Sequence, residues 1–129
     1  MWIATNIGFY SIVKKPSHFD EQGPEVYVIR ARDKADLSRL LAKASEKPGF
    51  QWRDESVLRI HDWDYSDYRY RIYAVDEDDF AALFDALKAT ITYDNFKDEI
   101  HATPHQRKKY PSYCNLWQDI MTAHSNPPL

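Results

Sequence analysis

The chain has 129 residues, 43% of them hydrophobic and 15% aromatic, with a formal net charge of −3. This composition is typical of one globular domain and excludes an intrinsically disordered chain. The 3 glycines form no glycine-rich phosphate loop, and the single cysteine, Cys114, has no partner for an internal disulfide or a spaced metal site. The N-terminal stretch lacks the basic start of a signal peptide, and no apolar run approaches the length of a membrane span. We therefore expect a soluble cytoplasmic protein without membrane contact.

A short phrase occurs twice, 43 positions apart, as ARDKADLSRLL at 31–41 and AVDEDDFAALF at 74–84. Both copies have the form Ala-x-Asp-x-x-Asp-(Leu/Phe)-x-x-Leu-(Leu/Phe), and each follows a run rich in β-branched and aromatic residues. The leucine and phenylalanine positions continue as one apolar helix face. The repeat predicts a duplicated unit in which a strand gives way to a helix.

The start of each helix explains the aspartates of the repeat. Asp33 and Asp76 stand at N-cap positions, where a carboxylate accepts hydrogen bonds from backbone N–H groups of the first turn. Asp36 and Asp79 follow three residues later, where negative charge is favourable at the positive end of the helix dipole. The acidic cluster at 76–79 therefore requires no bound cation.

Four strand-like runs precede the two helices as hairpin pairs. Apolar, β-branched and aromatic residues identify these runs, and turn-forming residues separate the members of each pair, at 16–24 in the first and at Ser66-Asp67 in the second. The predicted strands are 7–15, 25–33, 56–65 and 68–76.

The resulting order, ββα-ββα, is that of a ferredoxin-like βαββαβ fold whose last strand has moved to the front. We therefore expect an α+β domain with a four-stranded antiparallel sheet and two helices on one face. The strands 25–33 and 68–76 would lie side by side in the centre, and their hairpin partners would form the edges.

The pattern changes after Ile91 to that of a helical extension. Asp94 is expected to cap a short helix, and Thr103-Pro104 with Gln106 resembles a capping box for another. A final helix restarts at Pro111. Its apolar stripe consists of Tyr113, Leu116, Trp117, Ile120 and Met121. We expect residues 1–129 to form one domain, with a duplicated core at 1–91 and a C-terminal helical extension at 92–129.

Alternation along the strands assigns each side chain to one face of the sheet. Ala31 and Ala74 occupy equivalent positions in the repeat, and placing them in the core turns every second residue of both central strands outward. On the predicted edge strand 56–65, Leu58 and Ile60 then point inward. The opposite face carries five of the eight arginines; its predicted binding residues are Arg30, Arg32, Arg59, His61, Trp63, Arg69, Arg71 and Tyr73, beside Val26, Val28 and Val75.

Three interpretations of this arginine-bearing face are open. It is a solvated surface whose long arginine stems cover apolar neighbours, or one that the C-terminal helices partly cover. It is a docking site for an acidic protein partner or for a second copy of the chain, which makes the protein a non-enzymatic binding or regulatory module; this is the function we favour. Or it binds single-stranded nucleic acid or another polyanion, since arginines beside Trp63 and Tyr73 supply charge and stacking surfaces. The net negative charge opposes this third interpretation.

An enzyme that uses His61 and nearby acids ranks third among the functions. In a strand, His61 and Asp62 point to opposite faces, which weakens a joint acid–base role. His101 and His105 have the spacing of two ligands on a helix, but Pro104 lies between them and no HExxH glutamate is present. We therefore assign no catalytic residue, no metal ligand and no cofactor.

Three stretches resemble a family of small bacterial proteins of uncharacterised function. They are MWIATNIGFYSIV at the start, VIRARDKADLSRLL at 28–41, and ITYDNFKDEI at 91–100 followed by Tyr113 and Trp117. That family commonly begins with Met-Trp, contains a GFxS strand and a YxNFK phrase, and ends in a helix with a tryptophan. The resemblance implies no catalytic residue, but it directs attention to Asn95 and Lys97 as further candidate binding residues.

Overall fold

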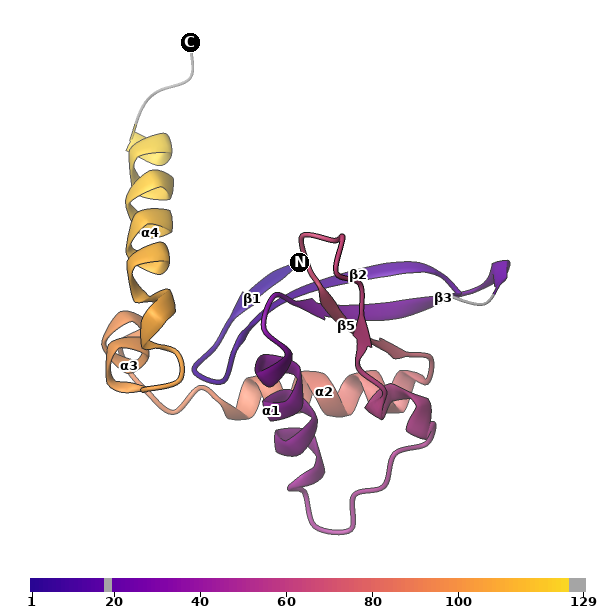
Figure 1. The fold of residues 1–129 in the computed structure, drawn as a ribbon. Helices are drawn as coiled ribbons and strands as arrows, with labels where there is room; N and C mark the ends of the chain where they lie inside the picture. The colour runs from indigo at the N-terminus through magenta and orange to yellow at the C-terminus, as the bar shows by residue number, and fades with distance from the viewer. Residues whose placement is uncertain (18–19, 126–129) are drawn as a thin grey trace. The chain divides into compact units, whose positions relative to one another are not determined.

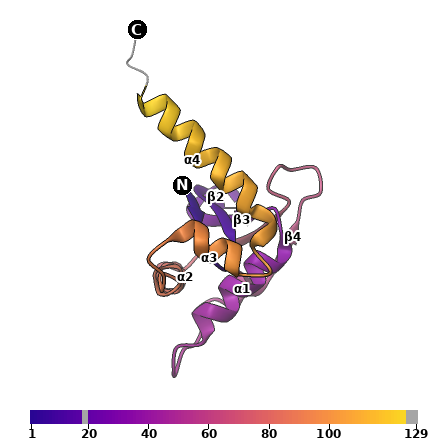
Figure 2. The same ribbon diagram turned by 90° about the vertical axis from the view of Figure 1, so that its left-hand side faces the viewer.

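The structure, a computed structural model, describes residues 1–17 and 20–125 of the chain. The chain divides into two compact units, Met1–Thr92 and Tyr93–Leu129. The first unit contains the sheet with helices α1 and α2, and the second contains helices α3 and α4 (Figures 1 and 2).

The first unit contains an antiparallel sheet of five strands in the order β1-β2-β3-β5-β4. The strands are β1 (Trp2–Ala4), β2 (Phe9–Ser17), β3 (Asp20–Ala31), β4 (His61–Asp62) and β5 (Tyr70–Ala74). The α+β class is confirmed, and β3 and β5 pair in the sheet, with Ile29 opposite Ile72. The predicted four-stranded ferredoxin-like sheet is wrong in its strand number, because the chain before β2 forms a further strand.

The additional strand, β1, forms a hairpin with β2 around a turn at 5–8. The Thr5 hydroxyl donates to the Gly8 carbonyl oxygen at 2.9 Å and accepts from the backbone N–H groups of Ile7 and Gly8 at 3.2 and 3.1 Å. A side chain that forms three local hydrogen bonds stabilises a tight turn. The polar pair Thr5-Asn6 is therefore a turn signal between two strands.

The predicted loop at 16–24 is largely strand. β2 continues to Ser17 and β3 begins at Asp20, with Pro16 opposite Glu25. The register shifts between Pro16 and Ser17, a position where a strand tolerates proline. Residues 18–19 lie outside the described part of the chain.

The predicted strand 56–65 is wrong over most of its length. A 3₁₀ helix, η1, covers Glu55–Leu58, and only His61–Asp62 pair with β5. The carboxylate of Asp54 accepts from the Ser56 backbone N–H and begins the 3₁₀ turn. Val57 is consequently the buried residue, while Leu58, predicted to point inward, is exposed.

Helices α1 (Lys34–Ser45) and α2 (Glu77–Ala89) begin as the repeat predicts. The Asp33 carboxylate accepts from the Ala35 N–H, and the Asp76 carboxylate accepts from the N–H groups of Asp78 and Asp79. Both helices lie on the same side of the sheet (Figure 1). The core between them and the sheet includes Ile29, Ala31, Ile72 and Ala74, which confirms the predicted alternation of the central strands. The rest of the core includes Tyr10, Ile12, Leu37, Leu40, Leu41, Val57, Leu83 and Leu87.

The second aspartate of each repeat has a larger role than a favourable charge near the helix start. Asp36 and Asp79 are 1% and 2% exposed. Asp36 Oδ2 accepts from the backbone N–H of Phe9 at 3.1 Å. Asp79 accepts from the N–H groups of Arg53 and Asp54 at 2.9 and 3.0 Å. Asp36 therefore joins α1 to the start of β2, and Asp79 joins α2 to the segment just before η1.

The second unit contains α3 (Phe96–Ala102), the 3₁₀ turn η2 (Arg107–Lys109) and α4 (Tyr110–Ser125). The rings of Phe96 and Tyr113 lie 5.2 Å apart between their centroids and join α3 to α4. Thr103, predicted to start a helix, ends α3, and its hydroxyl donates to the Glu99 carbonyl oxygen at 2.7 Å. None of the described helices combines the length and the apolar character needed to cross a membrane.

Candidate functional site

The outer face of the sheet, defined as the face opposite α1 and α2, carries two of the five predicted arginines on its strands. Arg30 and Arg71 lie directly opposite each other on β3 and β5. Arg71 is only 5% exposed and Arg30 is half-buried, whereas Arg32 and Arg69 are exposed. The outer face is therefore not simply a solvated surface. We call Arg30 and Arg71 the guanidinium pair.

The hairpin loop, residues 63–69 between β4 and β5, contacts the guanidinium pair. The Arg71 guanidinium carbon lies 4.4 Å from the Trp63 ring centroid. The guanidinium carbons of Arg30 and Arg32 lie 4.7 and 4.8 Å from the Tyr68 ring centroid. Contacts of this kind are cation–π interactions, which become stronger when water is excluded.

Hydrogen bonds satisfy the guanidinium pair only in part. Nη2 of Arg30 donates to the Ser11 hydroxyl at 2.6 Å, and Nη2 of Arg71 donates to the Ser66 hydroxyl at 3.0 Å and to the Tyr68 carbonyl oxygen at 3.2 Å. The Nε atoms of both arginines are buried and have no acceptor within the described part of the chain. A buried donor without an acceptor costs about 1–3 kcal/mol.

The guanidinium pair also lacks a carboxylate. Ion pairs among the described residues join Asp36 to Arg39, Glu46 to Lys43, Asp78 to Arg53 and Asp62 to Arg69, and none includes Arg30, Arg32 or Arg71. Burial lowers the pKa of the Arg30 guanidinium from its ordinary value, and the positive charge of Arg71 lowers it further. Like charges at directly opposite positions of an antiparallel pair destabilise the sheet. The protein thus retains two adjacent cations at an energetic cost.

Arg69 differs from Arg30, Arg32 and Arg71 because a carboxylate neutralises it. Its Nε and Nη2 atoms donate to the two oxygens of Asp62 at 2.7 and 3.0 Å, at the base of the hairpin loop. These hydrogen bonds hold the pKa of Asp62 below its ordinary value. The ion pair is therefore formed at neutral pH and is lost as the pH falls through the lowered pKa of Asp62.

We expect Asp62→Asn to loosen the hairpin loop without unfolding the protein. Both partners are about half exposed, at 50% for Asp62 and 48% for Arg69, so solvent screens their attraction and the melting temperature should hardly change. Amide hydrogen exchange at 63–69 should become faster. Asp64→Asn, which alters an exposed loop carboxylate outside any ion pair among the described residues, is the control. Equal exchange in the two variants would show that the Asp62–Arg69 pair does not hold the loop.

Of the remaining residues predicted for this face, Arg59 lies outside the strands and His61 lies on β4. Arg59 follows η1 as its C-cap and lies outside the strands, which corrects its predicted strand position. The His61 ring meets the Tyr73 ring edge-on, with centroids 4.9 Å apart. His61 also lies opposite Arg71 across β4 and β5. His61 therefore lies on the outer face. Its neighbour Asp62 forms the ion pair with Arg69.

Asn95 and Lys97 lie in the second unit and have local structural roles there. The Asn95 side chain caps α3 by accepting from the Asp98 N–H at 3.0 Å, a position that the sequence pattern assigned to Asp94. Nζ of Lys97 lies 4.3 Å from the Trp117 ring centroid. Neither contact indicates a ligand. No group of three histidine, cysteine or acidic residues within the described ranges is placed to hold a metal ion.

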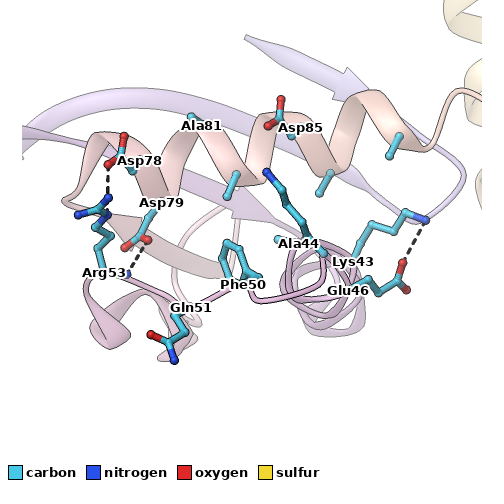
Figure 3. Close-up of a pocket in the computed structure, with 14 residues that line it drawn as sticks. Lys43, Ala44, Glu46, Phe50, Gln51, Arg53, Asp78, Asp79, Ala81 and Asp85 are labelled. Carbon is cyan, nitrogen blue, oxygen red and sulfur yellow. Dashed lines mark hydrogen bonds and ion pairs between the residues drawn. The ribbon is translucent and has the colours of Figure 1, made fainter.

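A second candidate site is a groove between α1, α2 and the segment that follows α1 (Figure 3). Its volume is about 480 Å³, a size that suits small ligands. The charged groups drawn with dashed lines in Figure 3 are paired with each other: Lys43 with Glu46 and Arg53 with Asp78. Asp79, the buried acid of the groove, accepts from two backbone N–H groups. Lys47 and Asp85 also line the groove and form no ion pair among the described residues, but no buried polar side-chain atom of the groove lacks a hydrogen-bond partner there. The guanidinium pair is therefore the stronger candidate.

Three contact residues of the guanidinium pair, Ser11, Ser66 and Tyr68, were not identified from the sequence. Alternation does place Ser11 on the outer face, since it lies opposite Arg30. Ser66 and Tyr68 reach the pair only because the hairpin loop bends over the sheet, which no periodic pattern encodes.

No protein-family model, curated protein or solved structure matches the chain. The resemblance to the bacterial family stays a prediction, and the site rests on its own geometry.

Proposed function

We propose that the protein is a non-enzymatic binding module whose outer face engages an acidic segment of a partner protein. The observation that carries the proposal is the presence of three guanidinium groups, those of Arg30, Arg32 and Arg71, outside all ion pairs among the described residues. In a protein with a net charge of −3, a local cluster of uncompensated cations selects a negatively charged surface.

Exposed residues around the guanidinium pair supply the first contacts. Arg32 is exposed, and Val75 and Tyr65 are 50% and 81% exposed. Lys15, opposite Val26 on β2, is exposed on the same face. Apolar and aromatic surface surrounded by cations fits a segment in which acidic residues alternate with apolar ones.

We expect a labelled oligoglutamate peptide to bind the protein at low ionic strength. Arg32→Glu should weaken this binding roughly tenfold, which corresponds to about 1.4 kcal/mol. Arg32 is exposed and forms no hydrogen bond among the described residues. Its contact with the Tyr68 ring contributes about 0.5–1 kcal/mol at an exposed site, so the variant should melt only slightly below the parent. Fluorescence anisotropy measures the affinity, and calorimetry checks the fold.

Lys88→Glu is the matched control, because Lys88 is an exposed cation on α2, on the opposite side of the sheet. If both variants weaken binding equally, net charge explains the effect and the proposed surface is wrong. Salt-sensitive binding of a labelled single-stranded oligonucleotide without peptide binding would replace the proposal by nucleic-acid recognition. A dimer that Arg32→Glu dissociates, again without peptide binding, would replace it by self-association.

A further inference from the structure

The guanidinium pair has unused hydrogen-bonding capacity at one place in the sheet. Arg30 and Arg71 are opposite residues of neighbouring strands, so their side chains leave the sheet side by side. Each has a buried Nε–H without an acceptor among the described residues, and Arg71 is 95% buried. Unsatisfied buried groups of this kind require an explanation, and a bound ion is one of the few available.

Two serine hydroxyls extend this set of donors. The Ser11 and Ser66 hydroxyl oxygens each accept from one arginine, which leaves each hydroxyl hydrogen to donate elsewhere. The site therefore offers two positive charges, two Nε–H groups and two O–H groups. A tetrahedral oxyanion of charge −2 balances the two guanidinium charges and has enough oxygen atoms for these donors. A single carboxylate, of charge −1, balances only one of the two guanidinium groups.

Trp63 and Tyr68 do not compete with such an anion. Their rings contact the guanidinium carbons at 4.4 and 4.7 Å, and the N–H groups of a guanidinium point outward in its plane. An arginine can therefore contact a ring with its face and an oxyanion with its edge. Access requires the hairpin loop to lift, and the exposed Asp62–Arg69 ion pair at its base is a weak fastening.

We propose that the guanidinium pair binds one phosphoryl group, supplied as free phosphate or by a phosphorylated side chain of the acidic partner. In the second form the inference rests on the proposed function and deepens it. The hairpin loop then encloses the phosphoryl group, with Ser11 and Ser66 as further donors.

The first test is a thermal melt of the full chain in inorganic phosphate and in chloride at equal ionic strength. Phosphate well above its dissociation constant should raise the melting temperature by about 5 °C. The rise should disappear in Arg71→Gln and in Arg30→Gln. Because each variant is compared with itself in the two salts, a lower starting stability does not affect the readout. Arg69→Gln, which alters the neighbouring arginine that already has a carboxylate, should retain the rise.

The second test separates the sources of the anion. A glutamate-rich peptide with one phosphoserine should bind at least tenfold more tightly than the same peptide with serine, and Arg71→Lys should remove most of that difference. A phosphate effect without peptide binding supports the phosphoryl site and contradicts the acidic-partner function. Peptide binding that depends on Arg32 but not on phosphorylation, with no phosphate effect, overturns the phosphoryl site alone. Acetate as effective as phosphate overturns the preference for a dianion.

Discussion

Gly8→Ala will destabilise the first unit by about 3 kcal/mol. An added Cβ would lie 2.6 Å from Cβ and Cγ of Asp36 and 2.6 Å from Oη of Tyr10, all of which belong to buried side chains. Relief of this overlap would move the carboxylate that accepts from the Phe9 N–H, or the tyrosine hydroxyl that donates to the Asp36 carbonyl oxygen at 2.6 Å. Chemical denaturation followed by circular dichroism measures the change.

Gly49→Ala provides the control for this substitution. Gly49 has φ +74°, and an added Cβ there meets no atom within 4 Å. Its cost is therefore limited to backbone strain of about 1 kcal/mol. Gly8 has no positive φ, so its substitution tests close packing alone. Equal losses in the two variants would mean that the contact between the turn at 5–8 and α1 is looser than the structure shows.

Asp79→Ala will cost about 3–4 kcal/mol of the free energy of unfolding. The substitution removes two hydrogen bonds from backbone N–H groups to a carboxylate, at Arg53 and Asp54, in a region where Asp79 is 2% exposed. It also frees the segment before η1, so amide hydrogen exchange at Arg53 and Asp54 should rise together with the loss of stability.

The neighbouring Asp78→Ala is the matched control for Asp79→Ala. Asp78 forms an ion pair with Arg53 at 3.2 Å, but both side chains are about two-thirds exposed, at 69% and 66%. Such a pair contributes at most about 1 kcal/mol. If Asp79→Ala proved as mild as Asp78→Ala, the repeat would be a helix-start signal only.

Asp36 and Asp79, the second aspartates of the repeat, have one role that the repeat predicted and one that it did not. The phrase predicted both helices, both N-caps and the core-facing alternation of the strands before them, because these features depend on residues close in sequence. It did not predict that Asp36 and Asp79 reach segments more than twenty residues earlier. The position of such a segment depends on how the whole unit folds, so no local pattern identifies the bond.

In the segment before β5, the sequence pattern predicted a structure that does not form. Residues 56–65 are rich in strand-forming types, and the pattern predicted one long edge strand. In the structure Asp54 caps a 3₁₀ turn and Asp79 holds the residues before it, which leaves only His61–Asp62 to pair. Local caps and a tertiary hydrogen bond thus override strand propensity.

The sequence by itself determined the α+β class, the two capped helices, the pairing of β3 with β5, and the face on which Arg30 and Arg71 lie. These follow from periodicity and from a repeated phrase, which are properties of neighbouring residues. Only the tertiary structure decided that a fifth strand joins the sheet and that Arg71 is buried while Arg32 is exposed. It also decided that Trp63, Ser66 and Tyr68 surround the guanidinium pair, because the path of a loop across a sheet depends on contacts between residues of different strands.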